Sequence, residues 1–130
     1  MLIELSVENY RSIKERVTFS MLATPDTELD QNIFRVPSIK NAQFFKTAFL
    51  YGPNASGKTN ILLALYYLRR IIRDNTQLNK GDKLLYDPFL LDEEYSKKPS
   101  SFEVKFVVDN VLYTYGVSLD ERKVHSEYLY

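Results

Sequence analysis

The stretch Gly52-Pro53-Asn54-Ala55-Ser56-Gly57-Lys58-Thr59 decides how this chain is organised. Two of the four glycines in the 130-residue chain fall in this stretch, in the spacing Gly-x4-Gly-Lys-Thr. The apolar run Ala48-Phe49-Leu50-Tyr51 precedes it, and apolar residues at helical spacing follow from Lys58 to about Arg73. A strand, a glycine-rich turn and a helix in this order form the context that a phosphate-binding loop requires.

The residue types of the stretch suit polyphosphate. Glycine at positions 52 and 57 lets the backbone curl without a clashing β-carbon, so that successive N–H groups face one concavity. Lys58 is expected to bring an ammonium to the β- and γ-phosphates, and the Thr59 hydroxyl to ligate the Mg²⁺ that bridges them. An ordinary helix start would leave Lys58 unexplained, because a cation there opposes the helix dipole unless an anion is bound. The predicted phosphate-binding residues are Gly52, Asn54, Ala55, Ser56, Gly57, Lys58 and Thr59.

The rest of the chain alternates between patterned segments and irregular ones. Period-two alternation predicts an antiparallel pair of strands near the N-terminus and a hairpin with the turn Asp109-Asn110 near the C-terminus. The helix carries apolar residues beyond one stripe, so it is expected to pack on two sides. The expected elements are strands over about 2–8 and 16–21, a long loop over about 23–43, a buried strand over 47–51, the helix over about 58–73, a polar connector over 74–101 and antiparallel strands over 102–130. The predicted fold class is α/β (α+β): an incomplete P-loop NTPase lobe, residues 1–130, with an antiparallel β subdomain.

A resemblance rests on three stretches: the P-loop, the turn Asn9-Tyr10-Arg11-Ser12 between the first two strands, and the connector sequence Pro88-Phe89-Leu90-Leu91-Asp92. With these stretches the chain resembles the N-terminal part of ABC-type ATPases of the SMC, RecF and OLD (overcoming lysogenisation defect) group. Within that group it looks like the bacterial AAA-type ATPases of abortive phage infection.

The resemblance implies Mg²⁺ with ATP, sandwiched between two heads, and hydrolysis only after a C-terminal lobe and head dimerisation complete the site. The implied partners are ATP, a second copy or a C-terminal lobe, and an effector protein, and the implied process is anti-phage defence. Arg11 would lie near the nucleotide or the head interface, with a solvent-exposed turn arginine as the alternative. Tyr10 is expected in the core rather than against a base.

Other parts of an ATPase that the resemblance implies are hard to find in this sequence. Asp92 and Asp109 each follow a short apolar run, as a magnesium-binding aspartate would, but they adjoin a polar connector and a hairpin turn. Gln77 is the only glutamine after the P-loop, and no Ser-Gly-Gly-Gln type signature occurs. Two alternatives therefore stay open. One is a self-contained small P-loop kinase or GTPase-like protein using Asp92 or Asp109; the other is a non-catalytic, ATP-gated interaction module or remnant.

The composition of the chain argues against three other classes of protein: nucleic-acid-binding, zinc-binding and membrane proteins. Seventeen basic residues balance seventeen acidic ones, so the net charge does not support wrapping of nucleic acid. Arg69, Arg70 and Arg73 are expected to complement the helix C-terminus instead. The chain has no cysteine and a single histidine, His125, which is expected to be a solvated strand residue, so a zinc site is not expected. The apolar run 61–68 is too short to cross a bilayer, and the first residues carry no basic leader, so a cytoplasmic protein without a membrane partner is expected.

Overall fold

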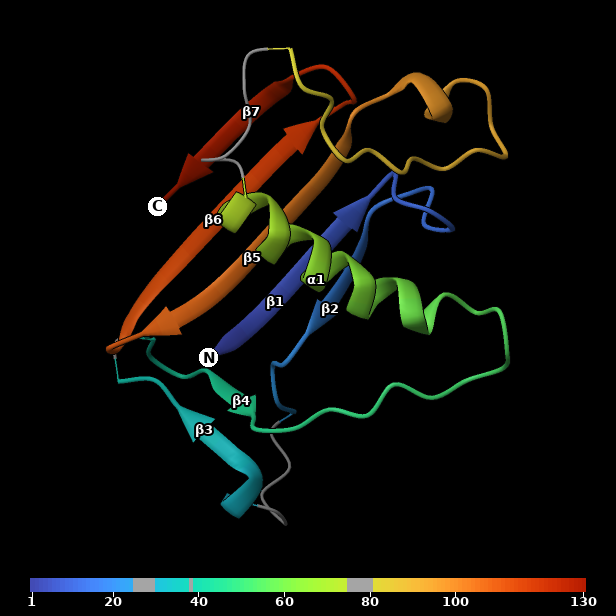
Figure 1. The fold of residues 1–130 in the computed structure, drawn as a ribbon. Coiled ribbons are helices and arrows are strands. Elements are labelled where there is room, and N and C mark those ends of the chain that lie inside the picture. The colour runs from blue at the N-terminus through green and yellow to red at the C-terminus, as the bar shows by residue number, and fades with distance from the viewer. Residues whose placement is uncertain (25–29, 38, 75–80) are drawn as a thin grey trace.

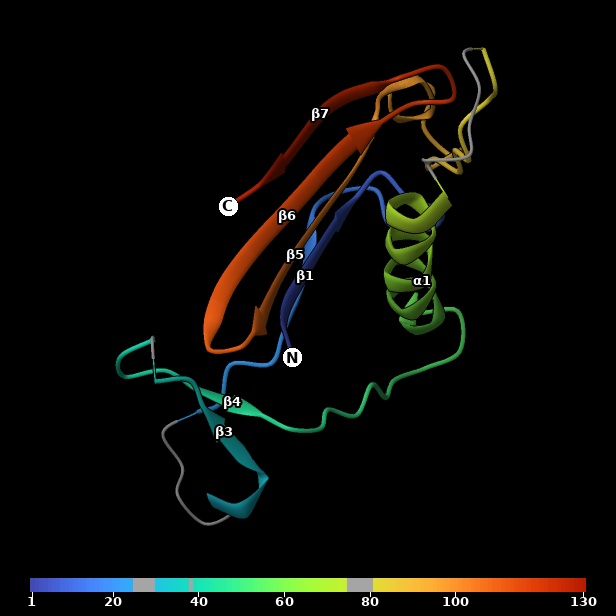
Figure 2. The same ribbon diagram turned by 60° about the vertical axis from the view of Figure 1, so that its left-hand side comes forward.

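The computed structural model describes residues 1–24, 30–37, 39–74 and 81–130. Its main layer is a five-stranded antiparallel sheet in the order β2-β1-β5-β6-β7, and the helix α1 (Lys58–Asp74) lies across one face of this sheet (Figures 1 and 2). The strands are β1 (Leu2–Glu8), β2 (Val17–Ser20), β5 (Ser100–Val108), β6 (Val111–Leu119) and β7 (Val124–Leu129). The expected mixture of helix and antiparallel sheet is confirmed.

The core forms between the sheet and α1 because each central strand alternates apolar and polar residues. In β1, Leu5 and Val7 are buried on the helix side, where Ala64 and Leu68 of α1 are also buried. The opposite face of the sheet is polar: Lys105 pairs with Glu4. The buried cluster consists of Leu5, Val7, Tyr10, Ile13, Ala64, Tyr67, Leu68, Ile71, Phe102, Val104, Tyr115, Val117 and Leu119.

The hairpin between β5 and β6 turns at Asp109 and Asn110. Their φ angles are 50° and 64°, and both values are positive, as a two-residue turn of type I′ requires. Val108 and Val111 are paired directly before and after the turn. The predicted hairpin is therefore confirmed, with β5 beginning at Ser100 rather than at 102.

The segment expected to be a long loop over 23–43 contains regular structure. A 3-10 turn, η1 (Asp30–Asn32), leads into β3 (Ile33–Arg35), which pairs with β4 (Gln43–Phe45) in a separate two-stranded sheet. Val36 and Phe44 bury this small sheet against Ile3 and Val107 at the end of the main sheet. Strands of three residues are too short to show a period in the sequence, which is why the prediction is wrong here.

The strand predicted over 47–51 is also wrong: the structure assigns no strand to these residues. Phe49 is 84% exposed and Tyr51 is 91% exposed, and Figure 2 shows this part of the chain running away from the main sheet toward the start of α1. An apolar run becomes a buried strand only beside strands that bond to its N–H and C=O groups. No such partner strand lies in the described chain.

The residues of α1 that the helical spacing predicts to be buried are Ile61, Ala64, Leu65, Leu68 and Ile72, but the buried stripe is a different one. Ala64, Tyr67, Leu68 and Ile71 face the sheet, whereas Leu65 and Ile72, which share helical spacing with Ala64 and Leu68, are 36% and 53% exposed. The helix is thus packed on one side only in this structure. Among the described residues, no helix combines the length and apolar character needed to cross a membrane.

Candidate functional site

The predicted phosphate loop connects residues 47–51 to α1 and takes the backbone conformation that its glycines allow. Gly52 has a φ of +153° and Gly57 a φ of +86°, values that side chains with a β-carbon rarely adopt. Ala55 also has a positive φ, at 63°. The residues between the two glycines therefore curl tightly in front of the first turn of α1.

Lys58 lies at the centre of this curl. Its Nζ donates to the carbonyl oxygens of Gly52, at 2.9 Å, and Pro53, at 2.6 Å, and to Ser56 Oγ at 3.2 Å. The ammonium is thus held inside the loop, beside the N-terminus of α1, whose first N–H groups have no acceptor within the helix. A fixed cation and a helix N-terminus together form a site for an anion.

Thr59 follows Lys58 in the first turn of α1. It is exposed, and it lines a hollow of about 300 Å³ with Ser12 and residues 55–60. A hydroxyl oxygen is a ligand that Mg²⁺ accepts, so Thr59 fits the predicted metal contact. The described residues contain no group of three acidic or histidine side chains that could hold a metal ion by themselves.

A larger hollow, of about 600 Å³, adjoins the first one. Both are lined by Ser12, Ala55, Ser56, Gly57 and Lys58. The larger hollow is lined further by the start of β2 and by the exposed segment before the loop, through Ile13, Lys14, Glu15, Val17, Leu50, Tyr51 and Ile61. The turn after β1 therefore forms one wall of the hollows beside the predicted phosphate loop.

Within that turn, Arg11 does not line either hollow. Its Nε lies 3.0 Å from Asp87 Oδ2, and its backbone N–H donates to the Asp87 carbonyl oxygen at 2.8 Å. Tyr10 is a core residue, 5% exposed, with its ring stacked on that of Tyr67 at a centroid distance of 5.4 Å. The structure thus places Arg11 against the connector, and Tyr10 where it was expected.

Asp92 and Asp109, the two candidate magnesium ligands, do not line either hollow beside the phosphate loop. Asp92 Oδ2 lies 2.8 Å from Lys14 Nζ, while its Oδ1 accepts from the backbone N–H groups of Glu94 and Tyr95 ahead of η3 (Tyr95–Lys97). The hydrogen bond and charge of Lys14, with these two N–H groups, lower the pKa of Asp92. Asp109 occupies the β5–β6 turn. Gln77 lies outside the described residues.

His125 has a carboxylate partner that the sequence did not reveal. Its Nε2 lies 2.7 Å from Asp120 Oδ2, across the turn between β6 and β7. Asp120 also accepts from the backbone N–H groups of Arg122 and Lys123, at 2.7 Å and 2.9 Å. The expectation of a solvated strand residue is confirmed, because His125 is exposed in β7. Its pairing with Asp120 was not expected, and a turn of a few residues brings the two side chains together.

An apolar hollow of about 720 Å³ extends from the outer face of α1 to Val104 and Phe106 of β5. Leu62 and Tyr66 are about three-fifths exposed there, at 62% and 60%. Its walls are Leu62, Leu65, Tyr66, Leu68, Arg69, Ile72, Arg73, Val104 and Phe106. Exposed apolar side chains that gather on one surface are typical of a contact surface.

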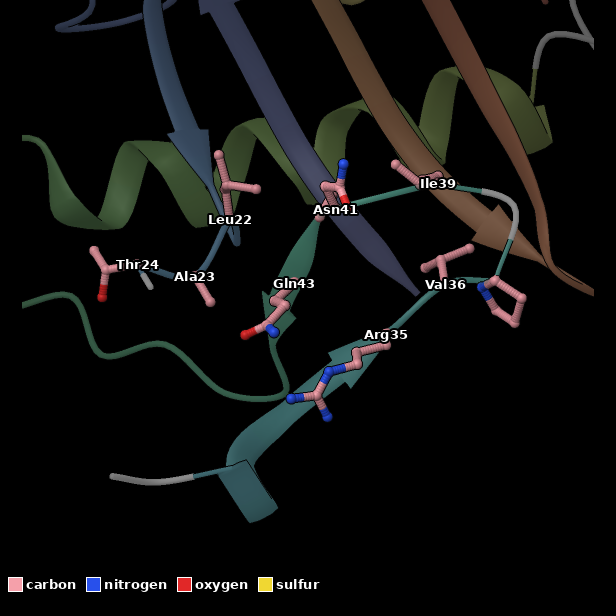
Figure 3. A pocket seen from close by; sticks show the side chains of 10 residues that line it. Leu22, Ala23, Thr24, Arg35, Val36, Ile39, Asn41 and Gln43 are labelled. Atoms are coloured by element: carbon pink, nitrogen blue, oxygen red, sulfur yellow. The ribbon is translucent and has the colours of Figure 1, made fainter. Parts of the chain in front are cut away.

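A further hollow of about 710 Å³ lies beside the small sheet and shares no lining residue with the two hollows at the phosphate loop. Figure 3 shows its side chains coming from three segments: Leu22 to Thr24 after β2, Arg35 and Val36 at the end of β3, and Asn41 and Gln43 at the start of β4. The guanidinium of Arg35 is paired with Asp30. Among the described residues, the lining is made of apolar side chains, Thr24, Arg35, Asn41 and Gln43.

Comparison with known proteins shows a match to one protein family. Residues 48–130 match the family described as "AAA domain, putative AbiEii toxin, Type IV TA system". The matched part contains the phosphate loop, α1, the connector and strands β5 to β7. No curated protein matches the chain.

Proposed function

The chain belongs to this family of AAA domains, and we propose that its P-loop binds Mg-ATP through the polyphosphate. The observation that carries the proposal is the position of Lys58, whose Nζ lies 2.6 Å to 3.2 Å from three loop oxygens directly in front of the α1 N-terminus. In the complex, the ammonium exchanges these neutral oxygens for phosphate oxygens, which are stronger acceptors because they are charged.

The other loop residues complete the phosphate contacts. Gly52 and Gly57 hold the curl, and Asn54, Ala55 and Ser56 turn their backbone N–H groups toward the phosphates. Thr59 supplies a hydroxyl to the magnesium ion that accompanies the nucleotide. Bound Mg²⁺ neutralises charge that develops on the phosphates; this chain's residues bind and orient the nucleotide.

We further propose that hydrolysis needs more of an ATPase head than these residues provide. Asp92, the aspartate that most resembles a magnesium ligand in the sequence, is engaged with Lys14 instead. Two apolar surfaces support a second layer, namely the outer face of α1 and the exposed residues Phe49 and Tyr51. A C-terminal lobe is the occupant that suits both surfaces, and a second copy of the head would close the nucleotide site.

The biological setting follows from the family and the resemblance. The family description names a toxin of a type IV toxin–antitoxin system, and the opening of the chain resembles ATPases of abortive phage infection. We propose that the ATPase serves anti-phage defence in the cytoplasm, where Mg-ATP is available, with an effector protein as partner. Phage plating on cells with the wild-type gene and with a Lys58→Ala allele tests this role, and equal plating on both would contradict it.

Titration calorimetry with Mg-ATP tests the binding site. Lys58→Ala removes a charge-assisted contact to phosphate, so affinity should fall at least about tenfold. Lys83→Ala is the matched control. Lys83 is an exposed lysine of the connector that pairs with Glu121, and its replacement should leave the affinity for Mg-ATP unchanged. Unchanged ATP affinity in Lys58→Ala would refute the phosphate site.

The rate of ATP hydrolysis and the mass of the protein in solution test whether the ATPase site must be completed by a further lobe and a second head. The chain of residues 1–130 should hydrolyse ATP far below the roughly 10 s⁻¹ of a typical enzyme. Full enzymatic turnover by this chain alone would overturn the proposal. If heads close around ATP, the mass of the protein should rise toward that of a dimer only with nucleotide, whereas association without nucleotide would favour a structural module.

A further inference from the structure

Ser12, Ile13 and Lys14 of the Asn9–Lys14 turn line the larger hollow, and of these three residues only Ser12 also lines the smaller one. A β-carbon at Gly57 would lie 3.6 Å from Ser12 Oγ. Arg11, the residue before Ser12, is directed to Asp87 instead. In the smaller hollow the turn therefore presents a hydroxyl and not a guanidinium.

Asn60 determines how this hydroxyl can act. Asn60 Nδ2 donates to Ser12 Oγ at 2.5 Å, and an amide nitrogen can only donate, so the serine oxygen is the acceptor. The proton of the Ser12 hydroxyl is left for another acceptor, and the described residues supply none. Asn60 follows Thr59 in the first turn of α1, where its backbone N–H donates to the Gly57 carbonyl oxygen at 2.9 Å. The donor is thus fixed relative to the phosphate loop.

We propose that Ser12 is a further nucleotide ligand, whose hydroxyl donates to a phosphate oxygen of the bound nucleotide. Asn60 is the positioning residue, because its amide donates to the Ser12 oxygen and the Ser12 hydroxyl proton then points away from Asn60. Phosphate is the acceptor rather than a ribose hydroxyl, since Ser12 closes the 300 Å³ hollow whose other lining residues are Ala55 to Asn60. This inference rests on the proposed function, and it adds a nucleotide contact that comes from outside the phosphate loop.

Ser12→Ala tests the contact. Ser12 is exposed, so the variant should fold like the wild-type protein. Its affinity for Mg-ATP and for Mg-tripolyphosphate should fall by a similar factor, roughly tenfold, because both probes carry the phosphate oxygens. Ser12→Thr keeps the hydroxyl and should retain most of the affinity. Ser118→Ala is the matched control, because Ser118 only pairs with Ser101 within the sheet.

Asn60→Ala separates positioning from folding. It should weaken Mg-ATP binding less than Ser12→Ala does, and the double variant should lose less than the sum of the two single losses. Additive losses would overturn the positioning role. A loss in Ser12→Ala for ATP but not for tripolyphosphate would place the contact at the ribose and overturn the phosphate assignment.

The two proposals fail in different ways. If Lys58→Ala loses ATP binding while Ser12→Ala binds both probes like the wild-type protein, the Ser12 contact is refuted and the proposed function stands. If Lys58→Ala binds ATP unchanged, the proposed function is refuted and the Ser12 contact is refuted with it. Equal losses of ATP and tripolyphosphate in Ser12→Ala, with retention in Ser12→Thr, support the contact.

Discussion

The side-chain amide nitrogen of Asn9 lies 2.6 Å from the backbone carbonyl oxygen of Lys98, 89 positions later in the chain. The same nitrogen lies 2.8 Å from the carbonyl oxygen of Tyr95, and the amide oxygen accepts from the backbone N–H of Phe89 at 3.0 Å. Asn9 is 1% exposed, so these bonds form away from water. One buried side chain therefore ties the connector to the turn that also forms a wall of the phosphate site.

Asn9→Gly should destabilise the protein by about 2–4 kcal/mol, because it leaves buried backbone groups without partners. Glycine keeps the positive φ of 52° that asparagine has here, so backbone strain is not the cause. Asn41→Gly is the control, since Asn41 has a similar φ of 62° but is exposed. Urea unfolding of both variants measures the difference, and equal stability losses would show that the Asn9 side chain contributes little.

Tyr67→Phe should stabilise the protein by about 1 kcal/mol. The Tyr67 hydroxyl is buried without a hydrogen-bond partner in the described chain, and its removal ends the cost of taking a polar group out of water. The same substitution at Tyr86 should destabilise by about 1 kcal/mol, because the Tyr86 hydroxyl donates to the Lys98 carbonyl oxygen at 2.5 Å. Thermal unfolding compares the two variants, and a lower midpoint for Tyr67→Phe contradicts the assignment.

The fold was predictable wherever a pattern extends over enough residues to express its period. Strands β5 and β6 have nine residues each, and the turn between them needs two positive φ angles that asparagine and aspartate tolerate. The three-residue strands β3 and β4 carry too few positions for a period. The apolar run at 47–51 predicts a buried strand wrongly, because the described sheets offer it no strand to pair with and its side chains are exposed.

The site was predictable only in its local part. Residues 52–59 are contiguous, so one spacing identifies the whole loop. Ser12 and Asn60 are 48 positions apart, and nothing in either segment indicates that they meet. The side chain of Arg11 was assigned from resemblance, whereas Asp87, far along the connector, determines where it lies. Contacts between distant segments depend on packing, which a single sequence does not encode in any short pattern.

Asp120 should make stability depend on pH in the acid range. Its hydrogen bond with His125, together with the backbone N–H groups of Arg122 and Lys123, lowers the pKa of Asp120 to about 2. Because the folded pKa lies below the unfolded value of about 3.9, the stabilisation is complete above about pH 4 and is lost as the pH falls through about 2. Wild type should therefore exceed Asp120→Asn in stability at pH 5, and the difference should vanish near pH 2. A constant difference across this range in urea unfolding would contradict the assignment.

Asp92→Asn distinguishes the ATPase lobe from a self-contained kinase or GTPase-like protein. In the structure the carboxylate pairs with Lys14 and accepts from the backbone N–H groups of Glu94 and Tyr95, which is the pattern of a residue that orders the connector. We therefore expect Mg-ATP affinity to stay within about twofold of wild type. A magnesium ligand would behave differently, because its loss weakens nucleotide binding only when Mg²⁺ is present. Calorimetry with and without Mg²⁺ separates the two cases, and Asp109→Asn is measured in the same way because Asp109 is the other candidate ligand. A large loss confined to Asp92→Asn with Mg²⁺ would make Asp92 a metal ligand and the chain a more complete enzyme than proposed.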